Sequence, residues 1–180
     1  MKKLNLIYLM TFVSLMAVTI SGCKPDEPGP GEEELITTLT LTFTNAATSA
    51  ITTATFRDPD GDGGNPPTQF DEIVLAANST YNVAITLLNE SESPVEDITE
   101  EIEEEDDEHL FCFEVSGANV TITRTDTDGT YEVGLKSRWE TGAPSQGKVK
   151  VTLKHQPGVK NGTCAPGETD IEVDFVTKIQ

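Results

Sequence analysis

The chain has 180 residues, with 31 acidic against 12 basic side chains and a formal net charge of −19. This length suits one domain. A surface this acidic should repel nucleic acid and anionic lipid, so we expect no nucleic-acid partner. The charge could attract cations or basic partners, but solubility is the favoured explanation for it.

Residues 1–22 have the pattern of a secretory signal peptide. Lys2 and Lys3 precede an uncharged, mostly apolar run over 4–20, at or below the length of about 17–25 residues that a spanning helix needs. The segment ends in Ile20-Ser21-Gly22-Cys23, which resembles the lipobox of bacterial lipoproteins. The resemblance implies that Cys23 is acylated and becomes the N-terminus, with several acyl chains giving stable anchoring to a membrane. An N-terminal transmembrane anchor is the alternative.

Residues 23–34 predict a lipid-anchored flexible linker, because residues 24–34 contain prolines, glycines and charges but little to bury. Its start, Cys23-Lys24-Pro25-Asp26-Glu27, is similar to the signals that send lipoproteins of the Bacteroidota to the outer face of the outer membrane. We therefore expect a surface-exposed outer-membrane protein, with a periplasm-facing anchor as the alternative. Removing residues 1–22 takes away two basic residues and no acidic one, which leaves a formal charge of −21.

From residue 35 on, apolar residues alternate with polar ones, the period of a strand with one buried face. We expect an all-β domain over 35–180, an immunoglobulin-like antiparallel β-sandwich of about nine strands, with a small β-barrel as the alternative. The last two strands carry lysines and acids on their outer faces, so we expect antiparallel neighbours closed by the loop 156–168. Alternation is clearest at 35–44, 81–87, 109–115, 120–123, 131–135, 147–155 and 170–175.

The segment 58–65 places acids at alternating positions before glycine, through Asp58, Asp60 and Asp62. This pattern resembles the start of an EF-hand calcium loop. Counted from Asp58, the twelfth position is Gln69, where an EF-hand loop has a glutamate that binds calcium through both oxygens. A glycine- and aspartate-rich hairpin connection between strands 50–57 and 70–76 is therefore the favoured interpretation, and Asp126 to Gly129 predicts a second such turn.

One segment departs from strand periodicity and predicts a short acidic helix over 94–105. Ser93 suits the N-cap, Pro94 the first helical position and Glu96 the third. Val95, Ile98 and Ile102 would form one apolar stripe lying over an open end of the sandwich. The following acids stack like charges at the negative end of the helix dipole, which is unfavourable without a compensating cation.

Residues 96–108 contain ten acidic side chains, and His109 follows them. Carboxylates suit calcium, whereas imidazoles favour zinc or copper, so the segment is a candidate site for a divalent cation. A solvated acidic loop is the alternative. His155 is the other histidine of the chain, and it is in step with the core-facing residues of its predicted strand. It would strengthen the site if it lies at the same end of the sandwich as His109. The candidate ligands are Glu104, Glu105, Asp106, Asp107, Glu108, His109 and His155.

Two further residue types leave alternatives open. Cys112 and Cys164 form an even pair in an exported domain, so a disulfide is permitted, although spacing does not show whether they meet. Trp139 is either a core residue or a surface platform for sugar or peptide. Catalytic motifs such as GxSxG, HExxH and the P-loop are absent from the sequence, so we expect no catalysis.

Several motifs together resemble a set of small lipoproteins from flavobacteria and other Bacteroidota: the lipobox, Phe56-Arg57-Asp58-Pro59-Asp60-Gly61, Asp97-Ile98-Thr99-Glu100-Glu101-Ile102-Glu103, Leu153-Lys154-His155-Gln156-Pro157-Gly158 and Gly167-Glu168-Thr169-Asp170. Some of those proteins carry a type 1 periplasmic binding fold label, but this chain is too short and too strand-rich for two α/β lobes. The resemblance implies a compartment and gives no mechanism.

These observations favour a non-enzymatic binding module. Its ligand would be a divalent cation or a metal complex, which the protein would deliver to an outer-membrane transporter or receptor. The alternative is a structural or adhesin-like envelope protein that binds another envelope protein and has no metal role.

Overall fold

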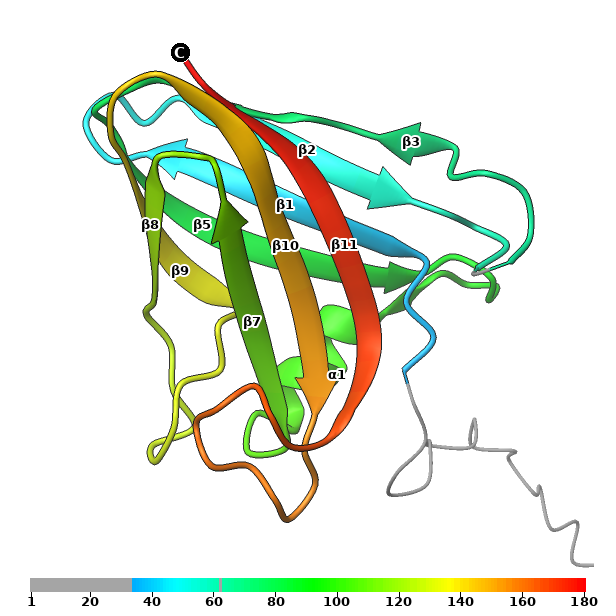
Figure 1. The fold of residues 1–180 in the computed structure, drawn as a ribbon. Coiled ribbons are helices and arrows are strands. Elements are labelled where there is room, and N and C mark those ends of the chain that lie inside the picture. Colours follow the sequence, from blue (N-terminus) through cyan, green and yellow to red (C-terminus); the bar gives the residue numbers. More distant parts are fainter. Residues whose placement is uncertain (1–33, 62) are drawn as a thin grey trace, which may run out of the picture.

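The computed structural model describes residues 34–61 and 63–180 and consists of two β-sheets packed face to face (Figure 1). The predicted β-sandwich is therefore confirmed, and the sheets do not close into a barrel. The predicted signal peptide, the lipid site at Cys23 and nearly all of the linker lie outside the described residues. In the described part of the chain, no helix has the length and apolarity needed to cross a membrane.

The larger sheet has the strand order β3-β2-β1-β5-β9-β8, with β6 paired to the far end of β5. All of its pairings are antiparallel. Its strands are β1 (Thr38–Asn45), β2 (Ile51–Arg57), β3 (Gln69–Phe70), β5 (Thr80–Asn89), β6 (Glu96–Asp97), β8 (Val120–Arg124) and β9 (Lys136–Thr141).

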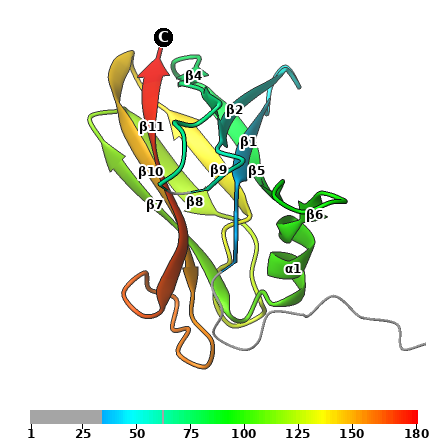
Figure 2. The same ribbon diagram turned by 90° about the vertical axis from the view of Figure 1, so that its right-hand side faces the viewer.

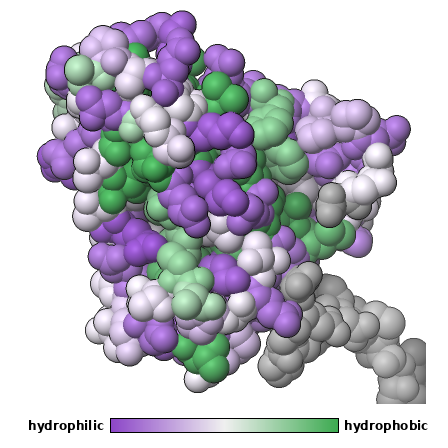
Figure 3. All heavy atoms as spheres, viewed as in Figure 1, coloured by the Kyte–Doolittle hydropathy of each residue, from purple (hydrophilic) through white to green (hydrophobic). Residues whose placement is uncertain are grey.

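The smaller sheet has the order β4-β11-β10-β7, built from β4 (Ile73–Leu75), β7 (His109–Ser116), β10 (Ser145–His155) and β11 (Glu168–Ile179). The predicted antiparallel pairing of the last two strands is confirmed. Lys150 Nζ lies 2.5 Å from Glu172 Oε1 on the outer face, and Lys148 Nζ lies 4.0 Å from Asp174 Oδ2. On the face shown in Figure 3, apolar residues lie in separate patches between hydrophilic ones.

The predicted strand over 70–76 is wrong, because the chain changes sheets within it. Strand β3 pairs with β2 in the larger sheet, whereas β4 pairs with β11 in the smaller one, in parallel. Asp71 lies between them, and its carboxylate accepts a hydrogen bond from the backbone N–H of Thr55. As part of β4, Ile73 and Leu75 are buried in the core on the side of the smaller sheet.

The predicted strand over 131–135 is also wrong, and the strand begins only at Lys136. The carboxylate of Asp126 accepts hydrogen bonds from the backbone N–H groups of Gly134 and Lys136. Gly134 has a φ of 96°, a conformation that excludes it from a regular ladder. A side chain therefore satisfies two N–H groups of this segment, while its carbonyls at Val133 and Leu135 accept from Phe111 on β7 and Ile85 on β5, in different sheets.

The space between the sheets is filled by the inward-facing residues of both, as the period of two predicts. Trp139 is fully buried and meets Phe43 and Phe113 edge to face, with ring centroids 5.2 and 6.0 Å apart. Its indole N–H donates to Ser137 Oγ at 2.9 Å. Trp139 is thus a core residue, and its interpretation as a surface platform is wrong.

The one helix in the described residues, α1 (Ile98–Glu104), lies across the lower end of the sandwich in Figures 1 and 2. It starts later than predicted, because Glu96 and Asp97 form β6 instead of a first helical turn. Asp97 is the N-cap, and its carboxylate accepts from Thr99 N–H. Ile98 and Ile102 are buried as expected, whereas Val95 is 53% exposed and does not belong to the stripe.

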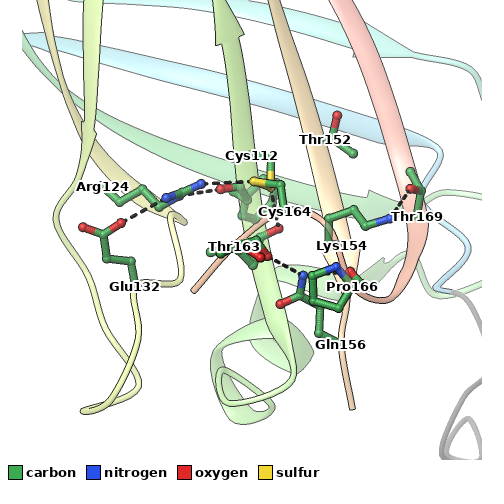
Figure 4. The surroundings of a disulfide bond; sticks show 12 residues. Cys112, Arg124, Glu132, Thr152, Lys154, Gln156, Thr163, Cys164, Pro166 and Thr169 are labelled. Atoms are coloured by element: carbon green, nitrogen blue, oxygen red, sulfur yellow. Dashed lines mark hydrogen bonds and ion pairs between the residues drawn. A yellow bond between two sulfur atoms is a disulfide. The ribbon is translucent and has the colours of Figure 1, made fainter. Parts of the chain in front are cut away.

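Cys112 and Cys164 form a disulfide with a Cα–Cα distance of 6.1 Å (Figure 4). The bond fixes the loop 156–167 against β7. Within that loop, the buried amide of Gln156 donates from Nε2 to the carbonyls of Thr163 and Pro166, both at 2.9 Å. The loop is therefore held by one covalent bond and by internal hydrogen bonds.

We predict that replacing both cysteines by alanine lowers the free energy of unfolding by about 2–4 kcal/mol, because the bond restricts the unfolded chain across 52 residues. Urea denaturation of the oxidised protein and of the double variant measures this difference. Reduction of the unaltered protein should reproduce it, and equal midpoints in all three samples would contradict it.

Candidate metal centre

Two histidines face each other at the lower end of the smaller sheet. His155 ends β10 and His109 begins β7, and the antiparallel register places the two residues directly opposite each other. Both side chains point inward, where His109 is fully buried and His155 is 6% exposed. Their rings stack with centroids 4.7 Å apart and planes within 4° of parallel. The two histidines therefore lie at the same end of the sandwich, which is the condition under which His155 strengthens the candidate site.

A tight turn over 105–108 folds the end of α1 back onto this pair. Glu105 N–H donates to Glu101 O, and Glu108 N–H donates to Glu105 O, both at 2.9 Å. Gln156 N–H in turn donates to Glu108 O at 2.6 Å. The acidic turn is thereby tied to the start of the loop that follows β10, and it covers the histidines.

This turn also sets the tautomer of His109. Its Nδ1 lies 3.0 Å from the carbonyl oxygen of Glu105, and because a carbonyl only accepts, Nδ1 carries the proton. The Nε2 lone pair is then available, and this buried atom has no hydrogen-bond partner among the described residues. A backbone carbonyl bound to one ring nitrogen commonly orients a histidine whose other nitrogen binds a metal.

The ring of His109 is neutral at physiological pH. Burial lowers its pKa to about 4, against the smaller opposing effect of the hydrogen bond to Glu105, while the charges of His155 and Lys160 lower it further. A neutral imidazole is the form that binds metal ions.

Glu105 completes a group of three with the histidines. One ligand atom from each of Glu105, His109 and His155 lies within 4.8 Å of the others. Glu105 is exposed, so this side of the group opens to solvent. Glu108 Oε2 lies 3.6 Å from His155 Nε2 and is the nearest candidate for a fourth ligand. Two imidazoles with one or two carboxylates suit zinc or copper better than calcium, which takes six to eight oxygens.

The other acids of the predicted ligand set do not join this group. Glu104 and Asp107 are exposed to solvent. The backbone carbonyl of Asp106 accepts from Lys160 Nζ at 2.5 Å. Asp106 also lines a neighbouring cleft of about 320 Å³, together with Glu103, Asp126 and Lys136. The interpretation of the whole acid cluster as a ligand set is therefore too broad.

Sequence reasoning missed a buried ion pair beside the site. The ammonium of Lys160 lies 2.7 Å from Asp128 Oδ2, and the two side chains are only 3% and 4% exposed. Burial raises the pKa of Asp128, but hydrogen bonds from Lys160, Tyr131 N–H and Thr130 N–H outweigh it and hold the pKa below its usual value. Lys160 thus joins the turns 105–108 and 126–131 to its own loop. A lysine in a loop with glycine and asparagine gives no sequence signal of this role.

The calcium-loop interpretation of Asp58, Asp60 and Asp62 gains no support from the geometry. One carboxylate oxygen of Asp60 accepts from the backbone and side-chain N–H groups of Asn65, at 2.8 and 2.7 Å. These bonds lower the pKa of Asp60 and form a closed turn. Asp58 is 8% exposed, and Asp62 lies outside the described residues.

Comparison with protein-family models, with curated proteins and with solved structures gave no match for this chain.

We predict that His109 remains neutral in the metal-free folded protein down to about pH 5, with the proton on Nδ1. The unfolded chain takes up a proton near pH 6.5 and the folded one near 4, so this histidine's contribution to stability is complete above pH 6.5 and is lost as the pH falls toward 4. Nitrogen-15 shifts of the imidazoles across a pH titration measure both properties. A His109 midpoint near 6.5 would contradict the prediction.

Proposed function

We propose that this chain is an exported, lipid-anchored protein of the outer membrane whose sandwich is a non-enzymatic binding module for a zinc or copper ion. The observation that carries the proposal is the buried, stacked His109–His155 pair with Glu105 beside it. The compartment is supported by the leader and its lipobox-like end at Cys23.

The chemistry of the site supports a borderline transition metal. His109 presents a neutral nitrogen without a partner among the described residues, in a tautomer that a backbone carbonyl maintains. An unpaired buried polar atom costs free energy, and a metal bond would remove that cost. A divalent ion would also offset the repulsion among Glu103, Glu104 and Glu105 at the negative end of α1.

The two kinds of ligand suit exchange as well as binding. The histidines lie on strands and are fixed by the sheet register, whereas Glu105 lies at the exposed start of a turn. An ion could therefore arrive and leave on the side of Glu105 without opening the core. This arrangement suits a module that passes a metal ion to an outer-membrane receptor, which is the partner that we propose.

We predict that residues 24–180, produced with the disulfide formed, bind one Zn²⁺ or Cu²⁺ per chain and show no comparable affinity for Ca²⁺. Isothermal titration measures the binding, and the ion should also raise the melting temperature because it binds only the folded state. His155→Gln and Glu105→Gln should each weaken binding by at least about tenfold, since each removes one of three ligands.

Glu104→Gln is the matched control. It removes the same charge from the neighbouring residue, whose side chain is exposed and does not belong to the group of three ligands. Binding that is unaffected in this control and weakened in the other two variants supports the site. An absence of heat and thermal shift with every ion, or equal losses in all three variants, would reject it. The adhesin-like alternative would then be tested by crosslinking on intact cells.

A further inference from the structure

One loop holds the acidic turn in place from outside. The loop follows β10 over 156–167, and its Gln156 N–H donates to Glu108 O at 2.6 Å. From the same loop, Lys160 Nζ donates to Asp106 O at 2.5 Å. The loop therefore fixes two backbone carbonyl groups of the turn.

The acidic turn is also the part of the proposed metal site that lies outside the sheet. Its Glu105 offers a carboxylate to the group of three ligands, and the Glu105 carbonyl lies 3.0 Å from His109 Nδ1. The residues around a metal's ligands keep those ligands oriented, and their loss typically weakens metal binding by about 10–100-fold. Release of the loop would therefore weaken the site without removing a ligand.

The loop is fixed near its other end by the Cys112–Cys164 bond (Figure 4). Several of its hydrogen bonds join residues of the loop itself, such as those from Gln156 Nε2 to the carbonyls of Thr163 and Pro166. Bonds within a loop maintain its shape but do not attach it to the sheet. The disulfide is the covalent attachment of the loop to β7.

The two sulfur atoms of this bond differ in access. Cys164 is exposed to solvent, whereas Cys112 is 5% exposed. Arg124 Nη2 donates to the Cys164 sulfur at 3.6 Å (Figure 4). Arg124 is oriented by bonds to Phe111 O at 2.6 Å and to Glu132 Oε2 at 3.0 Å. A guanidinium at this position attracts a thiolate that approaches Cys164 and stabilises the Cys164 thiolate when it leaves.

We propose, on the basis of the metal-binding function proposed above, that the Cys112–Cys164 bond is a thiol-controlled switch of the metal site, operated by a dithiol oxidoreductase. A thiolate of the oxidoreductase attacks the Cys164 sulfur, forms a mixed disulfide and releases Cys112. The second thiol of the oxidoreductase then attacks its own partner sulfur and releases Cys164. Two electrons pass to the protein, the dithiol becomes a disulfide, and its two protons end on Cys112 and Cys164.

The two states of the bond differ in what holds the acidic turn. With the bond closed, the loop is attached to β7 and keeps the turn against the histidines. With the bond open, the contacts of Gln156 and Lys160 with the turn must hold the loop without covalent support. The site therefore holds its ion in the oxidised protein and releases it when the bond is reduced.

The first measurement is the zinc affinity of the full chain in mild detergent, by isothermal titration. A Cys112→Ala/Cys164→Ala variant represents the open state, because it lacks the two thiols that would otherwise bind zinc themselves. Its affinity should be at least about tenfold lower than that of the oxidised protein. Leu41→Ala is the control, since a cavity in the larger sheet lowers stability but leaves the loop attached, and its zinc affinity should be unchanged.

The second measurement follows the reaction of the folded, oxidised protein with an oxidoreductase whose second cysteine has been replaced, so that the mixed disulfide is trapped. Mass spectrometry should find the oxidoreductase on Cys164 and not on Cys112. Arg124→Gln should slow the trapping several-fold. Arg138→Gln, an exposed change on β9, should leave the rate unchanged.

The outcomes distinguish a failed switch from a failed metal site. Equal zinc affinity in the oxidised protein and the double cysteine variant would reject the switch and leave the metal site standing. An absence of zinc binding by the oxidised protein would reject both. A bond that the oxidoreductase attacks only after the chain is unfolded would also overturn the switch, whatever the zinc affinity.

Discussion

The pairing of β10 with β7 is the constraint on which the lower end of the molecule depends. Its register brings His155 opposite His109 on the inner face and Thr152 opposite Cys112 on the outer face. Because side chains alternate along a strand, a shift of β7 by one residue would turn His109 to the surface and Cys112 into the core. The imidazole pair and the disulfide therefore have one common cause, although they lie on opposite faces of the same strand.

The concentration of acids around this end is tolerated in part because some of them are paired with lysines. Lys160 balances Asp128 inside the protein, and Lys136 lies 3.2 Å from Glu103 on the surface. Surface pairs of this kind contribute little, typically below about 1 kcal/mol. The buried pair is different, because removing either partner would leave a charge without compensation. The charge pattern is thus an arrangement of individual carboxylates with different environments, and a count of acids does not describe it.

The sequence predicts the architecture better than it predicts the details at the site. Alternation over 147–155 and 170–175 identifies two neighbouring strands, because each contacts the core along one face for its whole length. It fails at 131–135, where the backbone bonds to the side chain of Asp126 and to strands of both sheets, and at 70–76, where the chain changes sheets. Such failures arise because a side chain or a distant strand supplies the hydrogen bonds, and periodicity does not report either.

The same distinction applies to the candidate ligands. Local patterns singled out His155 by its inward parity and His109 by the acidic segment before it, but only the register of β10 on β7 shows that they meet. The selection of Glu105 over Glu104, Asp106 and Asp107 depends on the path of one turn after α1. Charge density alone does not distinguish these four neighbours. Glu34 was assigned to the linker, although its side chain is only 8% exposed.

The disulfide has a further consequence for how the chain responds to proteolysis. The segment between Cys112 and Cys164 contains β8 and β9 of one sheet and β10 of the other, so a single covalent ring passes through both layers of the sandwich. A protease that cuts once within this ring, for example in the turn 126–131, would leave the two fragments joined. Both histidine strands would remain on one covalent assembly, because one fragment carries β7 and the other carries β10. A single cleavage there would nick the chain without releasing either half.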